Sequence, residues 1–165
     1  MGSAIIDGCY RYVLTRDADP FGVGDFVMVM LNPSTADASA DDPTVRRCVG
    51  FATRYGCRRL VVVNLYAVRA TNPDDIWTAQ DPVGRDNDRH IAEACAAARI
   101  IVAAWGVPAN DAVEQRAEAV AQTISLCQDL WTLGLSKGGH PRHPLYLKNS
   151  SEPTLWRSAK GGPRG

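Results

Sequence analysis

Short runs of apolar residues alternate along the chain with longer stretches in which apolar residues recur at helical spacing. The runs are too short for helices and lack polar alternation, so they predict buried strands. This order is typical of an α/β protein, and predicts a three-layer sandwich with a mostly parallel central sheet of four core strands plus an edge strand. The edge strand is expected at residues 9–15, the core strands at residues 26–31, 60–66, 100–105 and 129–135, and the helices at residues 43–55, 86–99 and 110–127.

Three helix starts are marked by capping residues. Asp42 followed by Pro43 is a favourable start, because aspartate caps free N–H groups and proline fits the first helical position. Asp86 is a plausible cap for the second helix, and Asn110 or Asp111 for the third.

Polar residues concentrate in the segments that follow the predicted core strands. In a parallel sheet these segments share the carboxyl edge, where ligands bind. Asn32 ends the first core strand because Pro33 has no N–H to pair, and Ser34 and Asp37 follow closely. Asn64 lies near the end of the second core strand. The four segments read NPSTAD, NLYAVRATNP, WG and SKGGHPRHP.

Each of these polar residues also has an ordinary structural interpretation. Asn32 and Asn64 can satisfy backbone groups at a turn and a strand end, Asp37 can cap a helix, and the histidines can be loop residues. The grouping of so many polar residues at one predicted edge carries more weight than any one of them.

The composition fits a compact protein. A chain of 165 residues with 45% apolar content predicts a single α/β domain over residues 1–158, with a flexible tail at residues 159–165. No run approaches the roughly 20 apolar residues that span a bilayer, and no secretion signal is visible, so no membrane partner is expected. The five cysteines are scattered without a CxxC pair, which indicates reduced thiols in a cytoplasmic protein.

Charge is distributed unevenly along the chain. From residue 136 onward there are six basic residues and one acidic residue, although the chain as a whole is neutral. This asymmetry indicates either an anionic partner or a solvated terminus. Together with Arg69, the residues Lys137, Arg142 and Lys148 are the candidates for contacts with DNA phosphates.

Several familiar sites are missing from the sequence. It has no GxxxxGK[ST] phosphate loop, no GxGxxG after a strand and no GxSxG elbow. His140 and His143 are three residues apart, but Pro141 and Pro144 exclude the helix that would place them side by side for a metal. Neither a metal nor a cofactor is expected.

Ungapped blocks in the right order resemble a family of small bacterial and phage proteins of unknown function. The blocks are MLNPSTAD, DDPTVRRC, VVNLYAVRATNP, DPVGRDND, AWG and HPRHPLYL, and they extend over nearly the whole chain. More distantly, they resemble the uracil-DNA glycosylase superfamily, whose fold is an α/β sandwich with a parallel sheet. This resemblance implies a DNA-directed hydrolase of glycosylase type that excises a damaged or modified base.

The resemblance also implies roles for individual residues. LNP is similar to the first glycosylase motif, in which Asn32 would help to position the attacking water. VVVNLYAVRA is similar to the strand whose asparagine, here Asn64, hydrogen-bonds the extruded base. Either His140 or His143 would contact the leaving base, and Tyr66 is a candidate for stacking on it.

The chain departs from the glycosylase pattern in two places. Ser34, next to Pro33 in the expected base-binding segment, stands where the glycosylases have glycine or an aromatic residue. HPRHP replaces His-Pro-Ser-Pro, which leaves open which histidine acts.

Hydrolysis of an N-glycosidic bond suits the residues at this edge. The reaction develops positive charge on the sugar and negative charge on the departing base. Asn32 can orient a water without ionising, Asp37 can act as a base, and a histidine can donate to the leaving base. Asn64 offers a donor and an acceptor to a base edge. The alternatives are an enzyme acting on free nucleotides or nucleosides, and a non-catalytic nucleic-acid-binding module.

Overall fold

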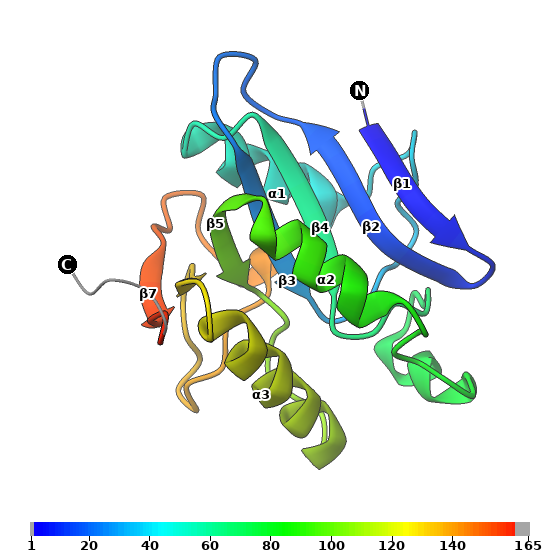
Figure 1. Cartoon of the computed structure of the whole chain (residues 1–165). Coiled ribbons are helices and arrows are strands. Elements are labelled where there is room, and N and C mark those ends of the chain that lie inside the picture. Colours follow the sequence, from blue (N-terminus) through cyan, green and yellow to red (C-terminus); the bar gives the residue numbers. More distant parts are fainter. Residues whose placement is uncertain (1, 161–165) are drawn as a thin grey trace.

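The structure is a computed structural model, and it describes residues 2–160 (Figure 1). A seven-stranded sheet runs through it in the order β1-β2-β4-β3-β5-β6-β7. The strands are β1 (Gly2–Asp7), β2 (Tyr10–Asp17), β3 (Asp25–Met30), β4 (Arg59–Asn64), β5 (Ala98–Ala103), β6 (Leu130–Thr132) and β7 (Thr154–Arg157). The α-helices are α1 (Pro43–Arg54), α2 (Asn87–Ala96) and α3 (Asp111–Ser125), and the 3₁₀ helices are η1 (Pro73–Thr78) and η2 (Pro144–Tyr146).

The predicted α/β class is confirmed, but the sheet is mixed. β3 pairs in parallel with β4 and β5, and β5 pairs in parallel with β6. β1, β2 and β7 join by antiparallel pairing. The expectation of a single edge strand at residues 9–15 is therefore wrong. β1 and β7 form the two edges of the sheet, and β2 lies between β1 and β4.

The two outermost strands carry little of the apolar pattern that predicts a strand. β1 is exposed over most of its length, and β7 is only half-buried. Pairing with β2 and with β6 defines these strands. β6 is shorter than expected because Thr132 Oγ1 bonds both the N–H and the carbonyl of Gly134, which turns the chain.

Helices cover both faces of the sheet. On one face α1 contributes Cys48 and Phe51 to a core that includes Phe26. On the other face α2 and α3 pack against Val27 and Val63. Figure 1 shows α2 and α3 in front of the sheet and α1 behind it.

Two of the predicted helix starts are confirmed. Asp42 Oδ1 accepts the N–H of Val45 at 2.8 Å, and Asn110 Oδ1 accepts the N–H of Val113 at 3.0 Å. Asp86 precedes α2, but its side chain makes no capping hydrogen bond.

The predicted tail, residues 159–165, is described only in part. The N–H of Ala159 donates to Asp129 Oδ1 at 2.7 Å, and the N–H of Lys160 donates to the Ser125 carbonyl at 2.9 Å. Residues 161–165 lie outside the described residues. Among the helices that the structure describes, none has the length and apolar character to cross a membrane.

Candidate functional site

The segments that follow β3, β4, β5 and β6 meet at one edge of the sheet. The N–H of Ala70 donates to the Pro33 carbonyl at 3.0 Å, which joins the loop after β4 to the loop after β3. The N–H of Gly106 donates to the Pro141 carbonyl at 2.8 Å, which joins the segment after β5 to the segment after β6. The structure therefore brings together segments that are far apart in the sequence.

Asn32 fastens two of these loops to each other. Its Nδ2 donates to the carbonyls of Pro33 at 3.0 Å and Ala70 at 2.9 Å. Met30 is paired with Asn64 across the two parallel strands, so Asn32 and Asn64 lie at the same end of neighbouring strands. Asn32 Oδ1 has no hydrogen bond to any described residue, so it is the atom free to accept one from a water or ligand.

Asn64 is buried without partners for its side chain. The residue is 1% exposed, and neither Oδ1 nor Nδ2 has a hydrogen-bond partner. Side chains alternate along a strand, and Val62 packs in the core beneath α1, so Asn64 faces α1 as well. Leaving a buried polar group unpaired costs about 1–3 kcal/mol. An amide in this state marks a place where a ligand or an ordered water can complete its bonds.

Four buried side-chain atoms in the described part of the chain lack a partner, and all four belong to residues around this edge. They are both amide atoms of Asn64, Nε of Arg11 and Oδ1 of Asn87. Asn87 donates Nδ2 to the carbonyls of Asn64 at 2.9 Å and Leu65 at 3.2 Å. Arg11 donates Nη1 to the Ala36 carbonyl at 2.8 Å. The edge therefore holds donors and acceptors that the protein itself does not use.

Arg11 places a buried positive charge at this edge. The residue is 3% exposed, and burial lowers its pKa to about 10. The Asp42 carboxylate opposes that shift, whereas the cations of Arg69 and Arg16 add to it. Arg11 forms no ion pair within residues 2–160, so its charge is available to an anion.

The two histidines of the HPRHP segment lie in different surroundings. His140 lines a cavity of about 210 Å³ beside α3, together with Trp105 and Trp156. His143 is the N-cap of η2 and lies near Gly106, on which an added Cβ would be 3.9 Å from the His143 Cβ. The structure therefore separates two residues that the sequence left interchangeable.

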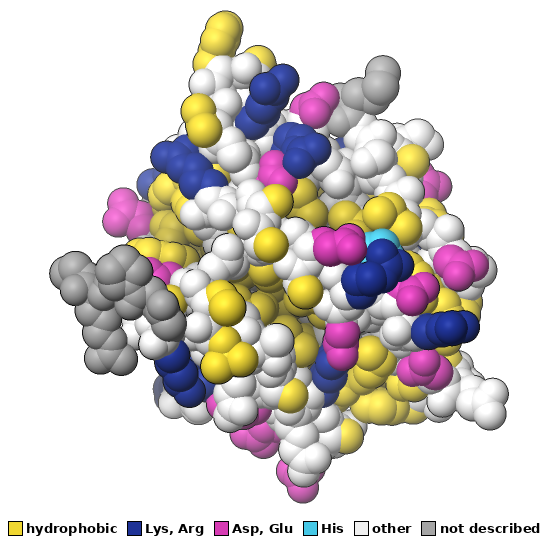
Figure 2. Space-filling model, in the orientation of Figure 1, with side chains coloured by type: hydrophobic (Ala, Val, Ile, Leu, Met, Phe, Trp, Pro, Cys, Tyr) yellow, Lys and Arg dark blue, Asp and Glu magenta, His cyan; other side chains and the backbone are white. Residues whose placement is uncertain are grey.

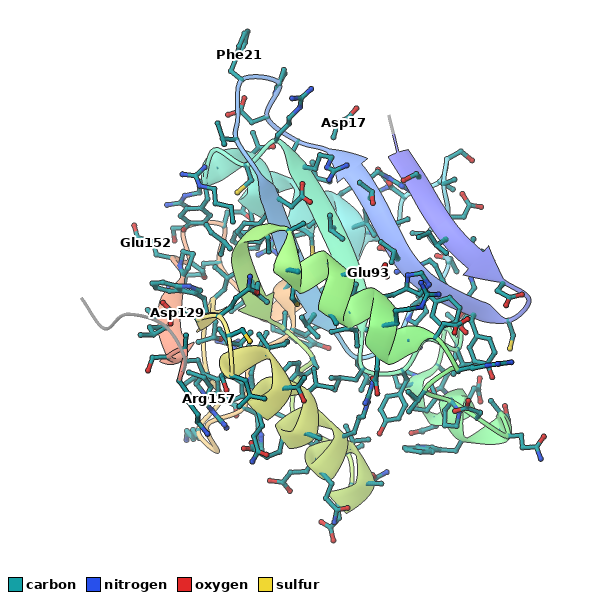
Figure 3. All side chains as sticks on the ribbon, viewed as in Figure 1. Asp17, Phe21, Glu93, Asp129, Glu152 and Arg157 are labelled. Atoms are coloured by element: carbon teal, nitrogen blue, oxygen red, sulfur yellow. The ribbon has the colours of Figure 1, made fainter. Side chains whose placement is uncertain are left out.

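An internal ion pair lines the cavity beside His140. Arg157 of β7 extends toward α3 (Figure 3), where it bonds the two carboxylate oxygens of Glu118 at 2.9 and 2.8 Å. The Arg157 guanidinium also lies 4.4 Å from the ring centre of Trp156. Its cation lowers the pKa of Glu118. The charges of Arg157 and Glu118 already neutralise each other, so this cavity offers a ligand fewer unpaired polar groups than the edge that holds Asn64.

His143 is set up as a neutral hydrogen-bond donor. Burial lowers its pKa, and the Asp42 carboxylate opposes this shift only in part. Its Nδ1 accepts the N–H of Leu145 at 3.2 Å, so the neutral ring carries its proton on Nε2. That N–H has no partner among the described residues and can donate to a ligand.

The lowered pKa of His143 predicts a pH dependence of stability. Because folding favours the neutral ring, the unfolded chain binds more protons below its own pKa of about 6.5, and stability falls as the pH drops through that value. We expect His143→Gln to lose less unfolding free energy than the unsubstituted protein between pH 7.5 and 5.5, measured by urea denaturation. Identical losses in both proteins would contradict the assignment.

Asp37 is engaged within its own loop. Its Oδ1 accepts the N–H groups of Ser39 at 2.9 Å and Ala40 at 2.8 Å, and the Ser39 hydroxyl at 3.3 Å. These bonds lower the pKa of Asp37, so the carboxylate is less basic than an ordinary aspartate. The arrangement favours a structural role, although as a turn residue rather than the helix cap considered from the sequence.

The side chains of Tyr66 and Asn64 lie on opposite faces of the sheet. Tyr66 is buried in the core on the side of α2 and α3, where its ring meets Trp77 edge-on at 5.5 Å between centroids. Burial raises the pKa of its hydroxyl. Tyr66 is therefore packed against η1, on the other side of the sheet from the Asn64 amide.

The four predicted phosphate contacts come from two segments, Arg69 after β4 and the other three after β6. Arg69 reaches back to the carbonyls of Ser34 and Thr35, each at 3.4 Å, and so braces the loop after β3. Lys137 and Lys148 are exposed. A fourth residue, Arg142, is also exposed and donates to the Tyr146 carbonyl at 2.6 Å.

Sequence reasoning missed Arg11 and Asp42 as parts of this edge. Arg11 lies in the strand predicted to be an edge, where a polar side chain needs no explanation. Asp42 was identified only as a helix cap, which it is. No sequence signal places Asp42 near both Arg11 and His143, because that depends on how distant segments pack. No set of three or more potential metal ligands occurs in the described part of the chain.

Comparison with known proteins gives one match. A family model described as a protein of unknown function (DUF1643) matches residues 11–145, which include the segments that form this edge. No curated protein and no solved structure matched the chain.

Proposed function

We propose that this chain, which belongs to the family described as proteins of unknown function (DUF1643), is a DNA-directed hydrolase that excises a damaged or modified base. The observation that carries the proposal is the buried Asn64 amide, whose donor and acceptor are both unused. An amide presents these two groups side by side, as the edge of a nucleobase does. The parallel pairing among β4, β3, β5 and β6 brings the segments that carry the proposal to one edge of the sheet.

The departing base would be stabilised by two groups, one from the segment after β6 and one from β2. The Nε2–H of His143 donates to an oxygen of the base, and the buried cation of Arg11 offsets the negative charge that develops there. A neutral histidine suffices for this role, because a hydrogen bond to a growing anion strengthens as the bond to the sugar breaks.

The attacking water would be held by Asn32. Both Nδ2 hydrogens of Asn32 have acceptors in the protein, which fixes the amide and leaves Oδ1 to accept from the water. Asn32 cannot take the proton at neutral pH, so it would orient the water, and the water's proton would pass to the departing base anion as the bond between sugar and base breaks. Asp37 contributes by shaping the loop behind Asn32.

Access to Asn64 requires the loop of residues 33–40 to move. Ala36 in this loop is buried in the same core as Met30, the strand partner of Asn64. The loop is tied down by Arg11 on the Ala36 carbonyl and by Arg16 on the carbonyls of Asp37 and Ala40. Base flipping would therefore be coupled to opening of this loop.

The proposal is tested by incubating the protein with duplexes that carry uracil, hypoxanthine or hypermodified bases and measuring abasic sites. We expect release from at least one duplex, and a loss of about 10²–10³-fold in the Asn32→Ala variant, comparable to removing one preorganised polar group. Gln115→Ala, which removes an exposed side-chain amide from α3, is the matched control and should retain full activity.

The same panel separates the alternatives. No release from any duplex would sink the glycosylase proposal. Tight mononucleotide binding with little salt-dependent DNA affinity would instead favour an enzyme of free nucleotides. DNA affinity that falls steeply with salt, without turnover and unchanged in Asn32→Ala, would favour a non-catalytic binding module.

A further inference from the structure

A groove of about 680 Å³ lies between α1 and the η2 segment, on the face of the sheet opposite α2 and α3. Its walls carry three arginines from α1, and no acidic residue lines it. Helix α1 itself contains no aspartate or glutamate. The residues that line the groove are Pro43, Arg46, Arg47, Gly50, Phe51, Arg54, Leu145 and Asn149.

Of the eleven arginines that the structure describes outside the groove, fewer than half are neutralised by a carboxylate. Five of them form ion pairs with carboxylates, namely Arg16, Arg59, Arg89, Arg116 and Arg157. Figure 2 shows the face of α2 and α3, where acidic and basic side chains are interspersed. The three groove arginines form no ion pair within the part of the chain that the structure describes. Their positive charge is therefore concentrated and uncompensated.

Two of the groove arginines are held in place by one hydrogen bond each, which leaves their other N–H groups free. Arg47 Nε donates to the Pro144 carbonyl at 2.7 Å, and Arg54 Nη1 donates to the Asn149 carbonyl. Each guanidinium keeps further N–H groups for an acceptor outside the protein. Arg47 and Arg54 are seven residues apart, about two helical turns, so they lie on one face of α1 roughly 10 Å apart.

Exposed apolar side chains stand beside this charge. Tyr146 is 72% exposed, and its ring lies 6.0 Å from that of His143 between centroids. Leu145 is also exposed and lines the groove directly. A basic groove next to an exposed aromatic ring is the combination that binds single-stranded nucleic acid, since arginines follow the phosphates and the ring stacks on a base.

We propose that the groove between α1 and η2 binds single-stranded DNA, with phosphates on Arg46, Arg47 and Arg54 and a base stacked on Tyr146. The choice of DNA rests on the proposed function. One end of the groove lies at Pro43 and Leu145, directly beside Asp42 and His143. The bound strand would thus run from α1 toward the edge that holds Asn64. The arginines proposed here to contact phosphates are not the basic residues that the sequence suggested for that role.

The test measures binding of a fluorescently labelled, unmodified thymidine oligonucleotide as a function of salt. Arg46→Gln is expected to weaken binding about threefold to tenfold and to reduce the slope of log affinity against log salt by about 0.7, the value for one phosphate contact on a single strand. Tyr146→Ala should weaken binding about tenfold or more, whereas Tyr146→Phe should bind as the unsubstituted protein does. Arg46 makes no side-chain hydrogen bond to a described residue, and the Tyr146 side chain is mostly exposed, so these variants should fold normally.

The matched control is Arg89→Gln on α2, which removes the same charge from an ion-paired arginine. Unchanged affinity in Arg46→Gln and Tyr146→Ala, or an equal loss in Arg89→Gln, would overturn the groove assignment. Tighter binding of single-stranded RNA or of duplex DNA would overturn the choice of ligand. The oligonucleotide carries no lesion, so its binding to the groove can be measured whether or not the protein releases a base. If Asn32→Ala loses base release but keeps its affinity for the oligonucleotide, the catalytic site and the groove act separately.

Discussion

Asn64→Leu is expected to stabilise the folded protein by about 1–3 kcal/mol and to abolish base release, a loss of at least about 100-fold. Leucine has the same number and branching of side-chain heavy atoms as asparagine but no polar atoms, so it removes two buried groups that have no partner. The free energy of unfolding from urea titrations and the rate of abasic-site formation measure the two effects.

Asn87→Leu is the matched control for this substitution. Asn87 is as deeply buried, but its Nδ2 donates to the carbonyls of Asn64 and Leu65. The change leaves both carbonyls without this donor, so it should destabilise the protein by about 1–3 kcal/mol. If Asn64→Leu destabilised the protein as Asn87→Leu does, the Asn64 amide would be a structural group.

Arg16→Met is expected to destabilise the protein by about 2–4 kcal/mol. Arg16 is mostly buried, pairs with Asp41 at 2.6 Å and donates to the carbonyls of Asp37 and Ala40. Methionine retains much of the packing but leaves these acceptors unpaired. Urea denaturation measures the loss, and amide hydrogen exchange at Ser39 and Ala40 should accelerate as the loop of residues 33–40 loosens.

Asp41→Asn separates the ion pair from the rest of this network. The Asp41 side chain is about a third exposed, and the amide oxygen of asparagine can still accept from Arg16. We expect a loss of less than about 1 kcal/mol. An equal loss in Arg16→Met and Asp41→Asn would show that the ion pair, and not the carbonyl contacts, holds the loop.

The fold could be predicted where strands are buried on both faces. β3, β4 and β5 are nearly continuous apolar runs, and the caps at Asp42 and Asn110 mark two helix starts. β1 and β7 could not be predicted, because both are exposed and depend on pairing with a neighbour. β2 was predicted as an edge, since nothing in GSAIID indicates that another strand covers it.

The candidate site could be predicted only as far as topology determines it. Asn32 and Asn64 were identified because a parallel sheet brings strand ends to one edge. The direction of each side chain was not predictable. Tyr66 packs on the face of α2 and α3, and His140 lines a cavity with Trp105 that His143 does not line. These outcomes depend on loop packing, which no local pattern in the sequence encodes.

The most direct test is to follow the side-chain NH₂ signals of Asn64 in ¹H–¹⁵N spectra while free nucleobases are added. Assignment comes from their disappearance in Asn64→Leu, and the exposed Gln115 on α3 serves as the reference. At least one base should shift the Asn64 signals and leave those of Gln115 in place. If no base of the panel moves the Asn64 signals, the buried amide is not a base receptor and the proposed site is contradicted.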